Sequence, residues 1–136
     1  MSDRPPPESP RAWLQRAASD LALARAALQI PDVLPEDACF HAQQCGEKAL
    51  KALLVSKGVR FPRTHVVETL LDLLKDSGTD IPLPIDEAFV LTQYAGQSRY
   101  PGEWEPVTDE EAVGAIDLAE RVLDWVTTQI GEEPRA

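Results

Sequence analysis

The chain has 136 residues, of which 13 are Lys or Arg and 23 are Asp or Glu, so its formal net charge is −10. The length suits one domain, and 43% hydrophobic and 26% charged residues are ordinary for a globular protein that folds without disulfides. The negative charge argues against a general nucleic-acid binder, which needs a broad basic surface, but it leaves room for a local basic site.

Two further features of the sequence indicate the cellular compartment of the protein. No segment approaches the ~20 apolar residues of a membrane span, and the first residues lack the apolar core of a secretory signal. Cys39 and Cys45 lie six residues apart on one predicted helix, where their side chains diverge too far to form a disulfide. We therefore expect reduced thiols in a cytoplasmic protein.

A single helical domain is predicted over residues 9–130, between a proline-rich tail (1–8) and a short polar tail (131–136) that are both expected to be disordered. The first helix is predicted to begin at the N-cap Ser9, with Pro10 at its first position, and to end before Pro31. Its apolar stripe consists of Trp13, Ala17, Leu21, Ala24 and Leu28.

The second helix is predicted from Pro35 to Lys57, because Gly58 is a natural residue to end it. Thr64 is predicted to cap a shorter third helix that ends at Lys75. The side chains predicted to face inward are Ala38, Ala42, Cys45, Ala49, Leu50, Leu53 and Leu54 in the second helix, and Val67, Leu70, Leu71 and Leu74 in the third.

A fourth helix is predicted over 84–95, and a fifth begins at the capping box formed by Thr108 and Glu111 and runs to about residue 130. The inward side chains of the fifth helix are Ala112, Ile116, Ala119, Leu123 and Val126. No segment alternates with a period of two. The sequence therefore predicts an all-α fold, an up-and-down antiparallel helical bundle of four to five helices.

One polar face of the second predicted helix carries His41, Gln44, Cys45 and Lys48. His41 and Cys45 are in register to bind a metal, but two ligands without a Cys-x-x-Cys pair are few for a metal site. The stronger interpretation is that His41 and Gln44 make polar contacts at a helix or subunit interface. We expect no metal and no cofactor.

Residues 47–65 are basic within an acidic chain. Five basic residues and one acid give this segment a charge of +4, which leaves −14 for the rest. Such a segment can bind phosphate groups or an acidic partner, or it can be the solvated end of an amphipathic helix. The basic residues are Lys48, Lys51, Lys57, Arg60 and Arg63.

A loop over residues 97–106 gathers Arg99, Tyr100 and Trp104 between two predicted helices. Arginine and aromatic residues in a loop are typical of functional and interface positions. The alternative is structural, with Trp104 folded over one end of the bundle.

The string CFHAQQCGEKALKALL over residues 39–54 resembles the second-helix signature of HEPN domains. Thr64-His65 and Arg99-Tyr100-Pro101-Gly102 fit the same family in order and spacing, and the resemblance covers residues 11–130. It implies a small helical bundle that forms homodimers. Such domains are often encoded beside, or fused to, a minimal nucleotidyltransferase in toxin–antitoxin pairs, and they have been linked to nucleotide binding.

The resemblance also implies a catalytic pattern that this chain lacks. Many HEPN domains are metal-independent ribonucleases with an Arg followed after four to six residues by a His, near the start of the last core helix. After Arg99 the corresponding positions hold Trp104, Glu105 and Pro106. Arg60 and His65 match the spacing, but they lie in the loop after the second helix.

We therefore expect a homodimer that binds a nucleotide or a nucleotidyltransferase partner. The residues expected to contact phosphate are Lys48, Lys51, Arg60, Arg63 and His65, with Arg99 and Tyr100 at the dimer cleft. A ribonuclease that uses Arg99 with His41 or His65 is one alternative. A purely structural dimerisation module is another.

Overall fold

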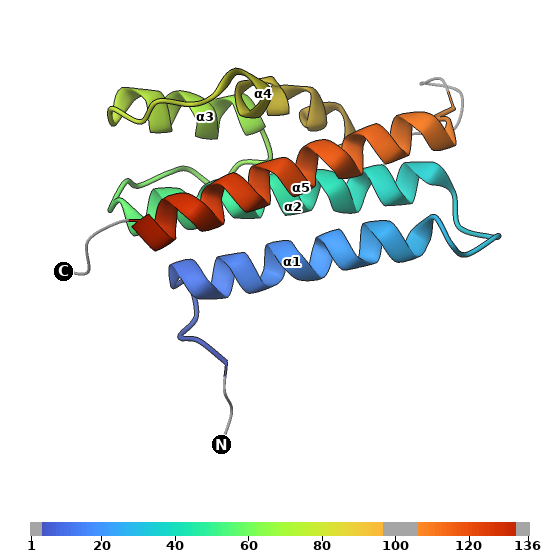
Figure 1. Ribbon diagram of the computed structural model, residues 1–136, viewed down its shortest axis with the longest axis horizontal. Coiled ribbons are helices and arrows are strands. Elements are labelled where there is room, and N and C mark those ends of the chain that lie inside the picture. Colours follow the sequence, from blue (N-terminus) through green and yellow to red (C-terminus); the bar gives the residue numbers. More distant parts are fainter. Residues whose placement is uncertain (1–3, 97–105, 133–136) are drawn as a thin grey trace.

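The structure, a computed structural model, describes residues 4–96 and 106–132. Three long helices, α1 (Pro10–Ala27), α2 (Pro35–Ser56) and α5 (Asp109–Glu132), lie side by side (Figure 1). Three shorter elements, α3 (Val67–Asp76), α4 (Leu83–Asp86) and the 3₁₀ helix η1 (Glu87–Tyr94), pack on α2 and α5 from one side. No strand occurs in this part of the chain, and the predicted all-α helical bundle is confirmed.

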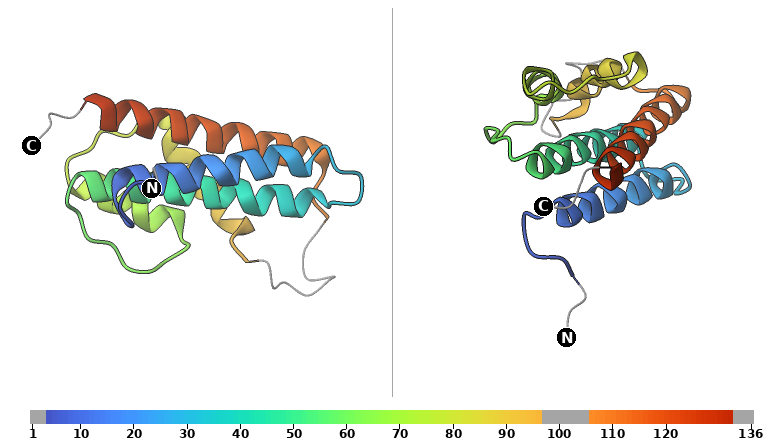
Figure 2. Two further views of the ribbon diagram at one scale, coloured as in Figure 1. Left: turned by 90° about the horizontal axis from the view of Figure 1, so that it is seen from below. Right: turned by 60° about the vertical axis from the view of Figure 1, so that its left-hand side comes forward.

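The direction of the helices decides which segments meet at each end of the bundle. α1 runs antiparallel to α2, as a short connection requires, whereas α5 runs in the same direction as α2 (Figures 1 and 2). The chain returns to the start of α5 through α3, α4 and η1, which lie across the top of the long helices in Figure 1. The start of α1 therefore lies beside the end of α2, and this end of the molecule carries the candidate site.

The N-terminus of α1 forms as predicted. The Ser9 hydroxyl accepts a hydrogen bond from the Ala12 N–H at 3.2 Å, and Pro10 occupies the first turn. Ala17, Leu21 and Ala24 are buried against α2 and α5. Asp20 is also buried on this face of α1, although the apolar pattern does not indicate it. Its hydrogen-bond partners lie on α2.

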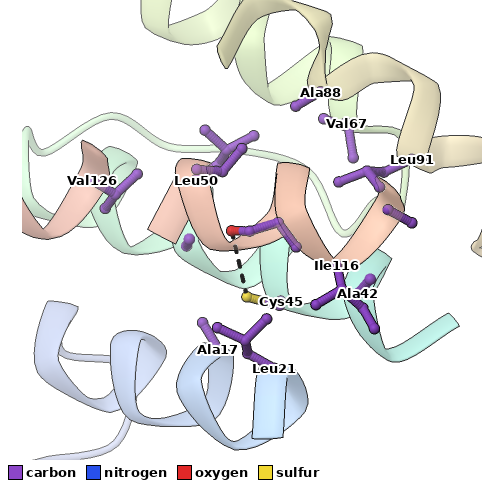
Figure 3. Packing of buried hydrophobic residues seen from close by; sticks show 14 of the residues in the cluster. Ala17, Leu21, Ala42, Cys45, Leu50, Val67, Ala88, Leu91, Ile116 and Val126 are labelled. Carbon is purple, nitrogen blue, oxygen red and sulfur yellow. Dashed lines mark hydrogen bonds between the residues drawn. The ribbon is translucent and has the colours of Figure 1, made fainter. Parts of the chain in front are cut away.

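The core is built around α2, whose small residues let the neighbouring helices approach closely. The Cys45 thiol points to the Ala119 carbonyl oxygen of α5 at 3.9 Å, and Ala17 and Leu21 of α1 lie below it (Figure 3). A Cβ atom at Gly46 would lie 2.9 Å from the Leu91 Cδ1 atom, so η1 packs here because the residue is glycine. No helix among the described residues is long and apolar enough to cross a bilayer.

Two elements of the structure differ from the sequence prediction. Thr64 does not cap α3: its hydroxyl accepts from the Val66 N–H at 3.0 Å, and the helix begins only at Val67. The predicted fourth helix is a single α-helical turn followed by the 3₁₀ helix η1, not one α-helix. In α5 the Thr108 hydroxyl accepts from the Glu111 N–H at 3.1 Å, which confirms the predicted start.

Candidate phosphate-binding site

A pocket of about 880 Å³ opens where the start of α1 meets the end of α2. Its walls come from the first turn of α1, the last two turns of α2 and the loop over residues 58–65. The polar and aromatic side chains that line it are Glu8, Trp13, Lys51, Arg60, Phe61, Arg63, Thr64 and His65.

The shape of the pocket depends on how α2 ends. Gly58 adopts a positive φ of 71°, and the Val59 N–H donates to the Leu54 carbonyl oxygen at 2.9 Å. This turn reverses the chain, so that the following loop folds back over the helix end. The loop brings Arg60, Phe61 and His65 to the same pocket as Lys51.

The buried carboxylate of Glu47 organises the polar wall. One oxygen accepts from Lys51 Nζ at 2.8 Å, and the other lies 2.8 Å from His65 Nδ1 and accepts from Gln43 Nε2 at 2.9 Å. The Glu47 side chain is 3% exposed and that of Lys51 8%. Burial raises the pKa of the Glu47 carboxyl, but the hydrogen bonds from Lys51, Gln43 and His65 outweigh it and hold the pKa below its usual value.

Two aromatic rings complete the environment of Lys51. Its ammonium nitrogen lies 5.5 Å from the ring centroid of Trp13 and 5.8 Å from that of Phe61, within the range of cation–π attraction. The two rings meet edge to face with their centroids 6.3 Å apart. The Trp13 indole nitrogen is buried and has no acceptor among the described residues.

A second cluster repeats the arrangement of the first. The carboxylate of Asp20, on α1, accepts from Lys48 Nζ at 2.6 Å with one oxygen, and its other oxygen lies 3.1 Å from His41 Nδ1. The Asp20 side chain is 10% exposed. This cluster joins α1 to α2, so His41 makes the polar contact between helices that the sequence favours.

The predicted site residues therefore fall into three groups. Lys51, Arg60, Arg63 and His65 line one pocket. Lys48 and His41 belong to the Asp20 cluster and are not among the residues that line that pocket. Arg99, Tyr100 and Trp104 lie outside the described residues.

Sequence reasoning missed the pairing role of Glu47 and the contribution of α1. The spacing of Glu47 and Lys51 by four residues is a usable signal for an ion pair on one helix. The apolar spacing predicts Trp13 only as a core residue, and it does not mark Asp20. Their roles depend on the packing of α1 against α2, which no local pattern reveals.

The two cysteines are buried and free. Burial raises the pKa of each thiol to about 12, with the nearby carboxylates of Glu111 and Asp20 adding to the effect at Cys39 and Cys45 respectively. Within the described ranges, no three His, Cys, Asp or Glu side chains are grouped so that they could hold a metal ion.

Known proteins resemble this chain over nearly its whole length. The family model of the HEPN domain matches residues 10–130. A protein of Methanocaldococcus jannaschii named "Putative toxin MJ1304" is 30% identical over 143 residues, which cover 89% of this chain and 88% of that protein.

Crystal structures of other proteins are also similar to this chain over most of its length. The archaeal HEPN homologue ST0689 is 34% identical with a TM-score of 0.72, over 90% of this chain and 98% of that one. TT1696 from Thermus thermophilus is 36% identical with a TM-score of 0.74, over 88% and 97%. A HEPN domain protein of Thermotoga maritima, 22% identical with a TM-score of 0.71 over 89% and 98%, shares the fold. The chain belongs to the HEPN family.

Proposed function

We propose that this HEPN protein binds a nucleotide in the pocket between α1 and α2, and that it acts as a toxin–antitoxin component with a minimal nucleotidyltransferase as its partner. The observation that carries the proposal is the pocket itself, which combines cationic and aromatic side chains. Its volume of about 880 Å³ lies in the range of small-molecule sites.

The lining residues suit the two halves of a nucleotide. Arg60 and Arg63 are exposed at the pocket, and a guanidinium group binds phosphate oxygens with two parallel hydrogen bonds. Phe61 offers a ring face to a base, with Val55 and Val59 as further apolar lining. Lys51 and His65 are held at the same wall by Glu47.

The toxin–antitoxin role is supported by the Methanocaldococcus relative, whose name describes it as a toxin and which matches this chain along most of both lengths. The expected nucleotidyltransferase partner is tested by the neighbouring gene and by co-purification of the two products. Failure of an encoded nucleotidyltransferase to bind the purified protein would contradict this part of the proposal.

The proposed homodimer is supported by exposed apolar side chains on α1, on the connection from α1 to α2 and on the first turns of α5. Leu23, Ile30, Leu34 and Val113 are each at least half exposed in the single chain. Light scattering on the full chain is expected to give twice the chain mass. Replacement of Leu34 and Val113 by Glu is expected to shift the protein to monomer, and an unchanged mass would exclude these side chains from the dimer interface.

Titration calorimetry with AMP tests nucleotide binding. We expect saturable binding by the full chain and at least a tenfold weaker affinity in Arg60→Ala and Arg63→Ala. The matched control is Arg121→Ala, which removes an exposed arginine from α5 without touching the pocket. Absence of binding at millimolar AMP, or equal losses in all three variants, would refute the proposal.

A ribonuclease activity is the second candidate, favoured by the contact between Glu47 and His65. With Nδ1 held by a carboxylate, the other imidazole nitrogen can exchange a proton beside the two arginines of the pocket. Incubation of the protein with RNA in EDTA tests it. If Arg99→Ala and His65→Ala leave any cleavage unchanged, this candidate is excluded.

A further inference from the structure

We infer that the pocket selects a nucleotide with a single phosphate group over the corresponding triphosphate. The inference rests on the proposed nucleotide binding and names the class of ligand. It follows from how the charges around the pocket are already paired within the protein.

Three cationic side chains line the pocket, but they are not equivalent. Lys51 is buried and forms an ion pair with Glu47 at 2.8 Å, so its charge is already compensated by a carboxylate that is itself 3% exposed. Arg60 and Arg63 have no carboxylate within 4 Å in the part of the chain that the structure describes. The charge available to a ligand is therefore that of two guanidinium groups.

A carboxylate at the same pocket reduces this charge further. Glu8 lines the pocket and is exposed, so the sum over Glu8, Arg60 and Arg63 is close to +1. A phosphate monoester carries a charge of roughly −1.5 to −2 at neutral pH, so a site charge close to +1 offsets half of it or more. A triphosphate adds two anionic phosphoryl groups. Among the described residues, no further unpaired cation lines the pocket to bind them.

The pocket also offers few carboxylates, among the described residues, for the route by which many proteins bind triphosphates. The Mg²⁺ ion that accompanies such ligands is commonly held in part by protein carboxylates. Both oxygens of Glu47 are taken, one by Lys51 and the other by His65 and Gln43, which leaves Glu8 as the carboxylate of the described pocket lining that a metal ion could reach. The apolar lining of Phe61, Val55 and Val59 remains available to the base, so adenosine alone and phosphate alone each use half of the site.

Calorimetry with adenosine, inorganic phosphate, AMP, ADP and ATP, with and without Mg²⁺, tests the inference on the full chain. We expect AMP to bind at least tenfold more tightly than adenosine, phosphate or ATP. ATP binding as tightly as AMP would overturn the inference but leave nucleotide binding intact. Absence of binding by every nucleotide would refute the proposed function instead. A ten-nucleotide RNA that bound more than tenfold tighter than AMP would also overturn it, because the pocket would then be part of a polynucleotide track.

Two variants test the charge argument directly. Glu47→Gln keeps the shape of the side chain but releases the charge of Lys51, so we expect the affinity ratio of ATP to AMP to rise about tenfold. Glu8→Gln removes an exposed negative charge and leaves the core intact, which keeps the test valid if the first variant folds poorly. We expect it to raise the same ratio several-fold. An unchanged ratio in the folded variants would show that charge pairing does not set the preference.

Discussion

Glu47 is the buried charge on which the pocket wall depends. Its carboxylate and the Lys51 ammonium compensate each other while both side chains are almost fully buried, and removal of one partner of such a pair typically costs about 3 kcal/mol or more. We expect Lys51→Met to lower the free energy of unfolding by about 3 kcal/mol, measured by urea denaturation. The double variant Glu47→Gln/Lys51→Met is the control and should recover most of the loss. Equal stability of Lys51→Met and the wild type would contradict the burial of this pair.

The same carboxyl group makes stability depend on pH. Its pKa in the folded protein lies below the ordinary value of 4.5, so folding favours the ionised form. This contribution is fully present above about pH 4.5 and is lost as the pH falls through the lowered pKa of the folded state. We expect the stability advantage of the wild type over Glu47→Gln to shrink as the pH is lowered below 4.5. Parallel stability curves for the two proteins would contradict this assignment.

At the scale of elements, the contact between α2 and η1 depends on a glycine. A methyl group at position 46 would approach the Leu91 side chain to 2.9 Å, and Leu91 is fully buried and has little room to move. We expect Gly46→Ala to destabilise the protein by about 1–3 kcal/mol in thermal or chemical unfolding.

Gly114 on α5 is the matched control for this substitution. It is an exposed helical glycine with nothing within 4 Å of an added Cβ, so Gly114→Ala is expected to stabilise by up to about 1 kcal/mol. If both substitutions changed stability by the same amount and in the same direction, the close approach of η1 would not be the cause.

The helices that could be predicted from sequence are those whose ends are determined locally. Ser9 and Thr108 accept hydrogen bonds from backbone N–H groups three residues ahead, and Gly58 ends α2 in the conformation expected of it. The start of α3 is different. The Val67 N–H donates to the hydroxyl of Thr92, 25 residues away, which places the helix start beyond the local turn at Thr64.

The candidate site, too, could be predicted from the sequence only in part. The cations of the α2–α3 loop were apparent as a basic segment of sequence, and the structure brings Arg60, Arg63 and His65 to one pocket with Lys51. The aromatic wall from Trp13, and the separation of Lys48 into the Asp20 cluster, could not be predicted. Both arise from the rotation of α1 against α2, which depends on the whole interface.

At the scale of the molecule, charge is distributed unevenly over the fold. The helix α5 alone contains seven acidic residues and one arginine, within a chain of net charge −10. The pocket side chains Lys51, Arg60 and Arg63 lie at the end of the bundle where α1 begins and α2 ends. The excess of like charges elsewhere opposes the compact state through mutual repulsion.

Salt should therefore stabilise this protein, because screening weakens that repulsion over distances of about 10 Å at 0.1 M ionic strength. We expect the midpoint of thermal unfolding to rise by a few degrees between low and moderate concentrations of sodium chloride. A fall would mean that surface ion pairs outweigh the repulsion. Phosphate at matched ionic strength should raise the midpoint further, because an anion that binds only the folded pocket adds stability. In the double variant Arg60→Ala/Arg63→Ala the chloride effect should persist while the additional effect of phosphate disappears, since screening acts on the whole surface and binding acts at one site.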